Sequence, residues 1–96
     1  MLTETFITET LTREKPFLLK EFHVEQIGYF GSYAVGKQRK DSDIDILVKL
    51  KEPLGLKFFM LQEYLEKILT AKIDLVTVKA LREELRKSIL SQTRYV

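Results

Sequence analysis

The spacing of hydrophobic residues along this 96-residue chain alternates between a helical and an extended pattern. The hydrophobic residues of the first segment lie at helical intervals: Leu2, Phe6, Ile7 and Leu11. The pattern predicts helix over residues 1–22, with Thr3 as its N-cap. We expect Pro16 to divide this region into two helices, because proline has no amide hydrogen and its ring collides with the preceding turn.

Three later segments have the pattern of β-strands: residues 24–30, 43–50 and 72–78. In the second of them, hydrophobic residues alternate with other residues, so one face of the strand carries Ile44, Ile46, Val48 and Leu50. Asp43, Asp45 and Leu47 fall on the opposite face. This alternation predicts a sheet that buries one face and presents two aspartates on the other.

Helices are expected between and after the strands, at residues 33–36 (a single turn), 56–70 and 81–90. Two sets of side chains are expected in the core: Phe58, Phe59, Leu61, Leu65, Ile68 and Leu69 from the second of these helices, and Leu81, Leu85 and Ile89 from the third. Residues 93–96 form either a short strand or a loose tail. Strands interleaved with helices in this order predict a single α+β domain, residues 1–96, with a small sheet covered by helices.

Composition narrows the possible functions. The net charge is +2, from 16 Lys and Arg against 14 Asp and Glu, which does not mark a dedicated nucleic-acid binder, so no direct nucleic-acid partner is expected. The chain has no cysteine, which excludes disulfides and thiolate metal sites. No stretch approaches the roughly 18 apolar residues of a membrane span. With no signal-like start either, we expect a cytoplasmic protein without a membrane partner.

Three aspartates occupy positions that packing alone does not explain. Asp43 and Asp45 open one strand and point to the same side of it, although aspartate is depleted in strands. Asp74 lies inside the next strand, and it joins the same site if the two strands are neighbours. Clustered carboxylates repel one another unless a cation lies between them, and Mg²⁺ prefers oxygen ligands. The simpler interpretation places Asp43 and Asp45 in a solvated turn, and Asp74 on an edge strand facing water.

Gly31 and Ser32 are suited to bind the phosphate groups of a substrate. They follow a strand directly and precede a helical turn, where glycine lets a phosphate approach the backbone and the serine hydroxyl can hold its oxygens. In the simpler interpretation the serine is a helix N-cap and holds no phosphate. A phosphate-binding turn beside clustered acids indicates metal-dependent phosphoryl or nucleotidyl transfer.

Gly31-Ser32, ten intervening residues and Asp43-Ile44-Asp45 match the motif G-S-x(10)-D-x-D. In this motif, and in the downstream stretch 72–77, the chain resembles the minimal nucleotidyltransferases (MNT) of the DNA polymerase β-like nucleotidyltransferase superfamily over nearly its whole length. The resemblance implies the nucleotidyltransferase fold, a small mixed β-sheet backed by helices. The chain departs from the commonest pattern of this family at Val35, where many relatives carry arginine.

The resemblance also implies a reaction and a partner. Asp43 and Asp45 would bind two Mg²⁺ ions, Asp74 would share one of them and help to activate the attacking hydroxyl, and Gly31 and Ser32 would hold the phosphates of ATP. Minimal nucleotidyltransferases are commonly paired with HEPN-domain ribonuclease toxins. The chain would then be a Mg-dependent protein adenylyltransferase, an antitoxin that transfers AMP from ATP to a tyrosine of its HEPN toxin and forms a hetero-oligomer with it.

Two other functions fit the same residues. A non-catalytic antitoxin would only mask its toxin, which Val35 favours and the three intact acids disfavour. A nucleotidyltransferase acting on RNA or on a small molecule is the other alternative, although 96 residues leave no room for a substrate domain. The basic run Lys37, Arg39 and Lys40 is either a solvated loop or a lid over an anionic ligand.

Overall fold

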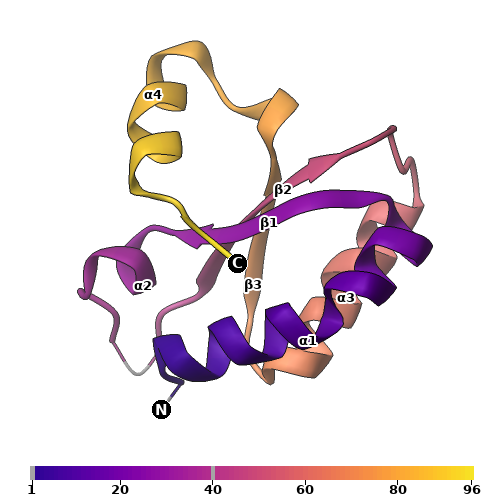
Figure 1. The fold of residues 1–96 in the computed structure, drawn as a ribbon. Coiled ribbons are helices and arrows are strands. Elements are labelled where there is room, and N and C mark those ends of the chain that lie inside the picture. Colours follow the sequence, from indigo (N-terminus) through magenta and orange to yellow (C-terminus); the bar gives the residue numbers. More distant parts are fainter. Residues whose placement is uncertain (1, 40) are drawn as a thin grey trace.

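Two long helices cover one face of a four-stranded sheet in the computed structural model, which describes residues 2–39 and 41–96 (Figure 1). In chain order the elements are α1 Glu4–Phe22, β1 Val24–Phe30, α2 Ser32–Val35, β2 Ile44–Leu50, α3 Lys57–Leu69, β3 Ile73–Thr77, the 3₁₀ turn η1 Val78–Ala80, α4 Glu83–Gln92 and β4 Arg94–Tyr95. The expected order of helices and strands is therefore confirmed, and residues 93–96 contribute a short strand.

The sheet is mixed, with the strand order β3-β2-β1-β4. β1 runs antiparallel to both β2 and β4, whereas β2 and β3 are parallel. Parallel neighbours need a crossover, and α3 supplies it between β2 and β3. This arrangement confirms the predicted fold class, a small mixed sheet backed by helices.

The core lies between the sheet and the α1/α3 pair. Ile44, Ile46 and Val48 of β2 are fully buried there, as the alternating pattern predicts. Their partners from the helices are also buried: Ile7, Leu11 and Leu18 of α1, and Leu61, Leu65 and Leu69 of α3. Because side chains alternate along a strand, burying this face of β2 turns its odd-numbered residues to the opposite face.

α1 is one continuous helix, so the prediction that Pro16 divides it is wrong. Its start is as expected, since the Thr3 side chain accepts a hydrogen bond from the Phe6 amide at 3.1 Å. The buried residues before and after the proline form one stripe along the helix: Ile7, Leu11, Leu18 and Phe22. Packing this whole stripe against the sheet outweighs the hydrogen bond that Pro16 removes, and its ring faces solvent.

Two predictions of buried side chains are also wrong. Leu85 is 49% exposed and none of the α4 residues is buried, because α1 and α3 already cover the apolar face of the sheet. Phe59 is 63% exposed, since one residue along a helix turns it about 100° away from its half-buried neighbour Phe58. No helix in residues 2–39 and 41–96 is both long enough and apolar enough to cross a bilayer.

Replacing Pro16 by alanine tests the continuous helix. Pro16→Ala restores an amide donor in the middle of α1, so we expect the free energy of unfolding to rise by about 1–2 kcal/mol, less than the full helix-interior cost of proline because the unfolded chain also gains freedom. Urea denaturation measures the change. Thr12→Ala, at an exposed position one turn earlier, is the control for helix propensity alone. A loss of stability in Pro16→Ala would show that the proline suits its site.

Candidate active site

Two aspartates lie side by side where β2 and β3 begin. In the parallel ladder Asp45 is the register partner of Asp74, so both side chains project from the same face of the sheet. This is the face opposite to the core residues Ile44 and Ile46. Asp43 lies two residues earlier, just before β2, and is exposed. The structure thus brings Asp45 and Asp74 together and leaves Asp43 at the entrance to the same acidic cluster.

The end of β1 reaches the same place from the other side. Phe30 pairs with Asp45 across the antiparallel ladder, and Gly31 follows it directly. Gly31 has a φ of +71°, in a region that side chains disfavour, and a Cβ atom on it would overlap the Asp45 carboxylate oxygen Oδ2. Only glycine therefore allows this close approach of the turn to the acid.

Among the residues that the structure describes, the charges that shift the pKa of Asp45 are those of the neighbouring acids Asp74 and Asp43. Burial raises the pKa of Asp45 to about 6, and the charge of Asp74, a hydrogen bond with it and the charge of Asp43 act in the same direction. Near neutral pH the carboxylate is ionised at a free-energy cost. A bound cation would remove that cost, which is the electrostatic signature of a site built for a positive ligand.

The chemistry of the donor set fits a hard divalent cation. All the ligand atoms it offers are carboxylate oxygens, which Mg²⁺ prefers. Among the residues that the structure describes, no three His, Cys, Asp or Glu side chains stand in the arrangement of a preassembled metal centre. Binding an ion therefore requires the carboxylates to rearrange, and the exposure of Asp43 and Asp74 leaves their side chains room to do so.

The backbone amide of Gly31 already has a partner within the protein. It donates a hydrogen bond of 2.8 Å to Oε1 of Gln92, the last residue of α4. The sequence predicts that Gly31 and Ser32 hold phosphates, and in this structure the first of these amides is taken. Sequence reasoning missed Gln92, because nothing in its local pattern signals a contact with a residue 61 positions away.

Ser32 begins α2, a single helical turn whose other end is also held. Arg94 of β4 donates from Nε to the carbonyl oxygen of Ala34 at 2.9 Å. Val35 ends the turn and is 52% exposed. Lys37 and Arg39 of the basic run are exposed in the following loop, and Lys40 lies outside the described residues.

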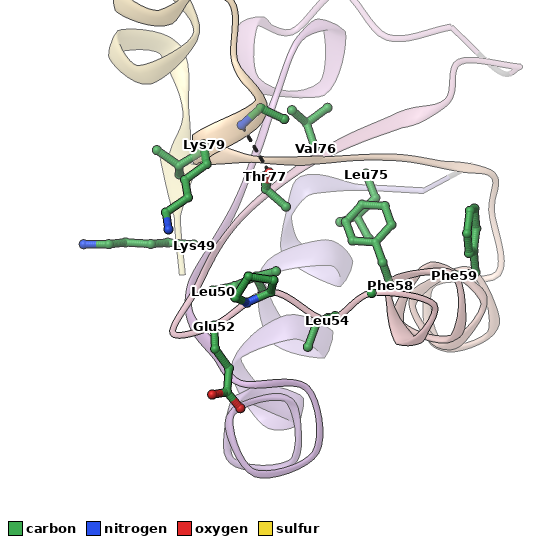
Figure 2. A pocket seen from close by; sticks show the side chains of 14 residues that line it. Lys49, Leu50, Glu52, Leu54, Phe58, Phe59, Leu75, Val76, Thr77 and Lys79 are labelled. Carbon is green, nitrogen blue, oxygen red and sulfur yellow. Dashed lines mark hydrogen bonds between the residues drawn. The ribbon is translucent and has the colours of Figure 1, made fainter.

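Two hollows lie at opposite ends of β2 and β3. One of about 630 Å³ adjoins the acidic cluster and is lined by Tyr33, Ser42, Asp43 and Lys72, among others. The other, about 730 Å³, is lined mainly by apolar side chains such as Leu54, Phe58 and Leu75, with Lys49 and Lys79 at its mouth (Figure 2). Of the three aspartates, only Asp43 lines the smaller hollow and none lines the larger one, so the smaller hollow is the one that adjoins the candidate active site.

Comparison with known proteins gives a consistent result. The model of the nucleotidyltransferase domain family matches residues 12–96. Protein adenylyltransferase MntA of Thermococcus cleftensis is 44% identical over 97 residues, covering 100% of this chain and 98% of the relative.

Solved structures of toxin–antitoxin complexes are also similar. A toxin–antitoxin structure with AMP-PNP, an ATP analogue, contains a chain that is 28% identical, with a TM-score of 0.70, covering 98% of this chain and 72% of that one. The structure of the tri-AMPylated HEPN toxin of Shewanella oneidensis in complex with MNT antitoxin contains a chain that is 25% identical, with a TM-score of 0.60, covering 96% of this chain and 66% of that one.

A pair of glycine substitutions tests the close approach of Gly31 to Asp45. Gly31 and Gly36 both have positive φ, at +71° and +74°, but a Cβ on Gly36 would meet nothing within 4 Å. We expect Gly31→Ala to lower the free energy of unfolding by about 1–3 kcal/mol more than Gly36→Ala, because only the first also displaces a carboxylate. Chemical denaturation of the two variants gives the difference, and equal losses would contradict the contact.

The raised pKa of Asp45 predicts a pH-dependent stability in metal-free buffer. Its folded pKa of about 6 exceeds that of an unfolded aspartate, about 3.9, so the folded state holds the proton more tightly. The contribution of this group to stability is complete below about pH 4 and is lost as the pH rises through 6. Asp45→Asn should therefore stabilise the metal-free protein at pH 8, by on the order of 1 kcal/mol after allowing for solvent screening.

Melting curves between pH 4 and pH 8 measure this effect. The variant should lack the loss that the wild type shows between pH 4 and pH 6. Asp41→Asn, in the exposed loop before β2, is the matched control and should keep that loss. An Asp45→Asn protein with the wild-type pH profile would disprove the electrostatic assignment.

Proposed function

Because the chain belongs to the nucleotidyltransferase domain family, we propose that it transfers AMP from ATP to a tyrosine hydroxyl of a partner HEPN ribonuclease toxin, and so acts as its antitoxin. The resemblance to the minimal nucleotidyltransferases expected from the motif is thereby confirmed. The observation that carries the proposal is the register of Asp45 beside Asp74, with Gly31 closing against Asp45. That is the arrangement which a metal-dependent transfer to a hydroxyl needs.

The binding half of the reaction uses the turn after β1 and the three acids. Ser32 and the Gly31 turn would hold the phosphates of ATP, while Asp43, Asp45 and Asp74 would hold two Mg²⁺ ions. Bound Mg²⁺ supplies charge neutralisation at the α-phosphate and the leaving pyrophosphate, and lowers the pKa of the attacking hydroxyl. The half-buried Asp45 gives the cluster a fixed centre, since its strand is fully paired on both sides.

The chemical half is an in-line displacement at the α-phosphorus. The tyrosine oxygen forms a bond to that phosphorus as the bond to the pyrophosphate oxygen breaks. Pyrophosphate leaves with the electron pair, and the proton of the tyrosine hydroxyl passes to a carboxylate. Asp74 is the best placed to accept it, because it is exposed and lies on the edge strand β3, where an acceptor protein can reach it.

In this proposal the acceptor belongs to another molecule. The 96-residue chain acts as one nucleotidyltransferase domain in this proposal, and its three acids open onto the surface. The HEPN toxin of the Shewanella complex is itself AMPylated, which supports a toxin as the acceptor here. We place the reaction in the cytoplasm, where ATP and Mg²⁺ are available, with no nucleic acid in direct contact.

Val35 supports one other function, an antitoxin that masks its toxin without modifying it. An uncharged residue stands at the exposed end of α2, beside the turn assigned to the phosphates. A masking antitoxin would bind the toxin with or without ATP. The transferase would require ATP and Mg²⁺ to inactivate it.

The experiment combines the purified protein, an HEPN toxin from the same genome and ATP labelled at the α-phosphate. We expect label on the toxin with Mg²⁺ present and none after EDTA. Asp74→Asn should slow transfer by about 10²- to 10⁴-fold, because it removes the proton acceptor from the site. Glu9→Gln, at an exposed position of α1, is the control and should transfer at the wild-type rate.

Two results would contradict this function. Toxin inactivated by a folded protein without any label would support masking instead. Transfer that survives Asp43→Asn combined with Asp45→Asn, at the wild-type rate, would show that these carboxylates hold no catalytic ion.

A further inference from the structure

Two side chains from the last part of the chain hold the turn that contains Gly31 and Ser32. Gln92 accepts the Gly31 amide hydrogen through Oε1 at 2.8 Å, and Arg94 donates to the Ala34 carbonyl at 2.9 Å. The two contacts therefore bracket the segment 31–34 at both ends. Glu4 of α1 anchors Arg94 in turn, with 3.4 Å between Oε1 and the Arg94 Nε.

The Gln92 contact is not a by-product of core packing. None of the residues in α4 is buried, so the helix is not pressed into the site by apolar contacts. The strand β4 follows the helix directly and is held by hydrogen bonds, through its pairing with β1 and the Val96 amide, which donates to the Ile27 carbonyl. The Gly31 amide and the Gln92 oxygen meet as a specific polar pair.

Gly31 needs such a partner because it has no side chain to fix its peptide. Its positive φ lies in a region that glycine enters and leaves readily. Glycine also has more conformational freedom in the unfolded chain than any other residue type. A turn that must be ordered when a nucleotide binds costs affinity, and one ordered beforehand does not. The Gln92 hydrogen bond orders this turn before any ligand arrives.

We propose that Gln92 is a positioning residue for the nucleotide: it holds the Gly31 peptide against Asp45 and keeps the phosphate-binding turn ordered. This inference rests on the proposed nucleotidyl transfer. It assigns the Gly31 amide to Gln92 rather than to a phosphate, which leaves phosphate contacts to Ser32. It also links the exposed helix α4 to the acidic cluster, so the position of α4 affects nucleotide affinity.

A blocking role for Gln92 predicts the opposite change in nucleotide affinity. If Gln92 only blocked the Gly31 amide, removing its oxygen would free a donor for phosphate and tighten nucleotide binding. A positioning role requires that binding weaken. The direction of the change in affinity therefore separates the two.

The test replaces Gln92 by methionine, which keeps the length of the side chain and removes the acceptor oxygen. Ser91→Ala is the control, since Ser91 precedes Gln92 in the same helix and its hydroxyl donates to the Ser88 carbonyl, an acceptor that it shares with the Gln92 side-chain amide. In the ligand-free protein, hydrogen exchange followed by NMR should show the Gly31 amide exchanging about tenfold faster in Gln92→Met and unchanged in Ser91→Ala. Gln92→Glu keeps an acceptor oxygen and should retain the protection.

Calorimetry with Mg²⁺ and AMP-PNP then measures affinity. We expect the Kd of Gln92→Met to rise about three- to tenfold, which is what the loss of one hydrogen bond accounts for. In the transfer assay the KM for ATP should rise by a similar factor with kcat nearly unchanged, because the acids are untouched. General destabilisation of the fold would not raise the KM for ATP while leaving kcat nearly unchanged.

The outcomes also separate this inference from the proposed function. Wild-type protein that fails to bind AMP-PNP would overturn the function itself. Wild-type binding with equal or tighter binding by Gln92→Met would overturn the positioning role and leave the function standing. Unchanged protection of the Gly31 amide in Gln92→Met would overturn the hydrogen bond on which the inference rests.

Discussion

The strand register that places Asp45 beside Asp74 is the constraint on which the candidate site depends. The two carboxylates are register neighbours in a parallel ladder and cannot separate without breaking the sheet. The other face of the same strands holds them there, because Ile44, Ile46 and Val48 are fully buried against α1 and α3. A slip of one residue would bury the acids and expose the core, so the hydrophobic packing fixes the geometry of the charged cluster.

This arrangement favours ligand binding at the expense of the free protein. Asp45 is half-buried, and its raised pKa records the cost of ionising it beside two other acids. Gly31 also contributes to this arrangement, because its missing side chain leaves room for the Asp45 carboxylate. Active sites often retain such unfavourable local interactions when a ligand compensates for them. Here the compensating ligand would be a cation carried with the nucleotide phosphates.

The exposed elements at the edge of the fold lie next to the candidate active site. The exposed Asp74 lies on an edge strand, α4 buries no side chain, and Gln92 and Arg94 tie the end of that region to the turn at Gly31. An acceptor protein that approaches β3 or α4 would therefore meet the elements to which we assign nucleotide binding. A nucleotidyltransferase that acts on another protein needs this kind of access.

The sequence by itself determined the order of the elements and the family. Alternation in residues 43–50 placed the aspartates opposite the core, and the spacing from Gly31-Ser32 to Asp43 and Asp45 identified the family, because both signals are local and periodic. The tertiary structure decided what depends on distant neighbours. Packing against the sheet kept α1 straight through Pro16, prior coverage by α1 and α3 left Leu85 exposed, and Gln92 met Gly31 across 61 residues. Local propensity carries no information about such contacts, which exist only once the sheet has brought the segments together.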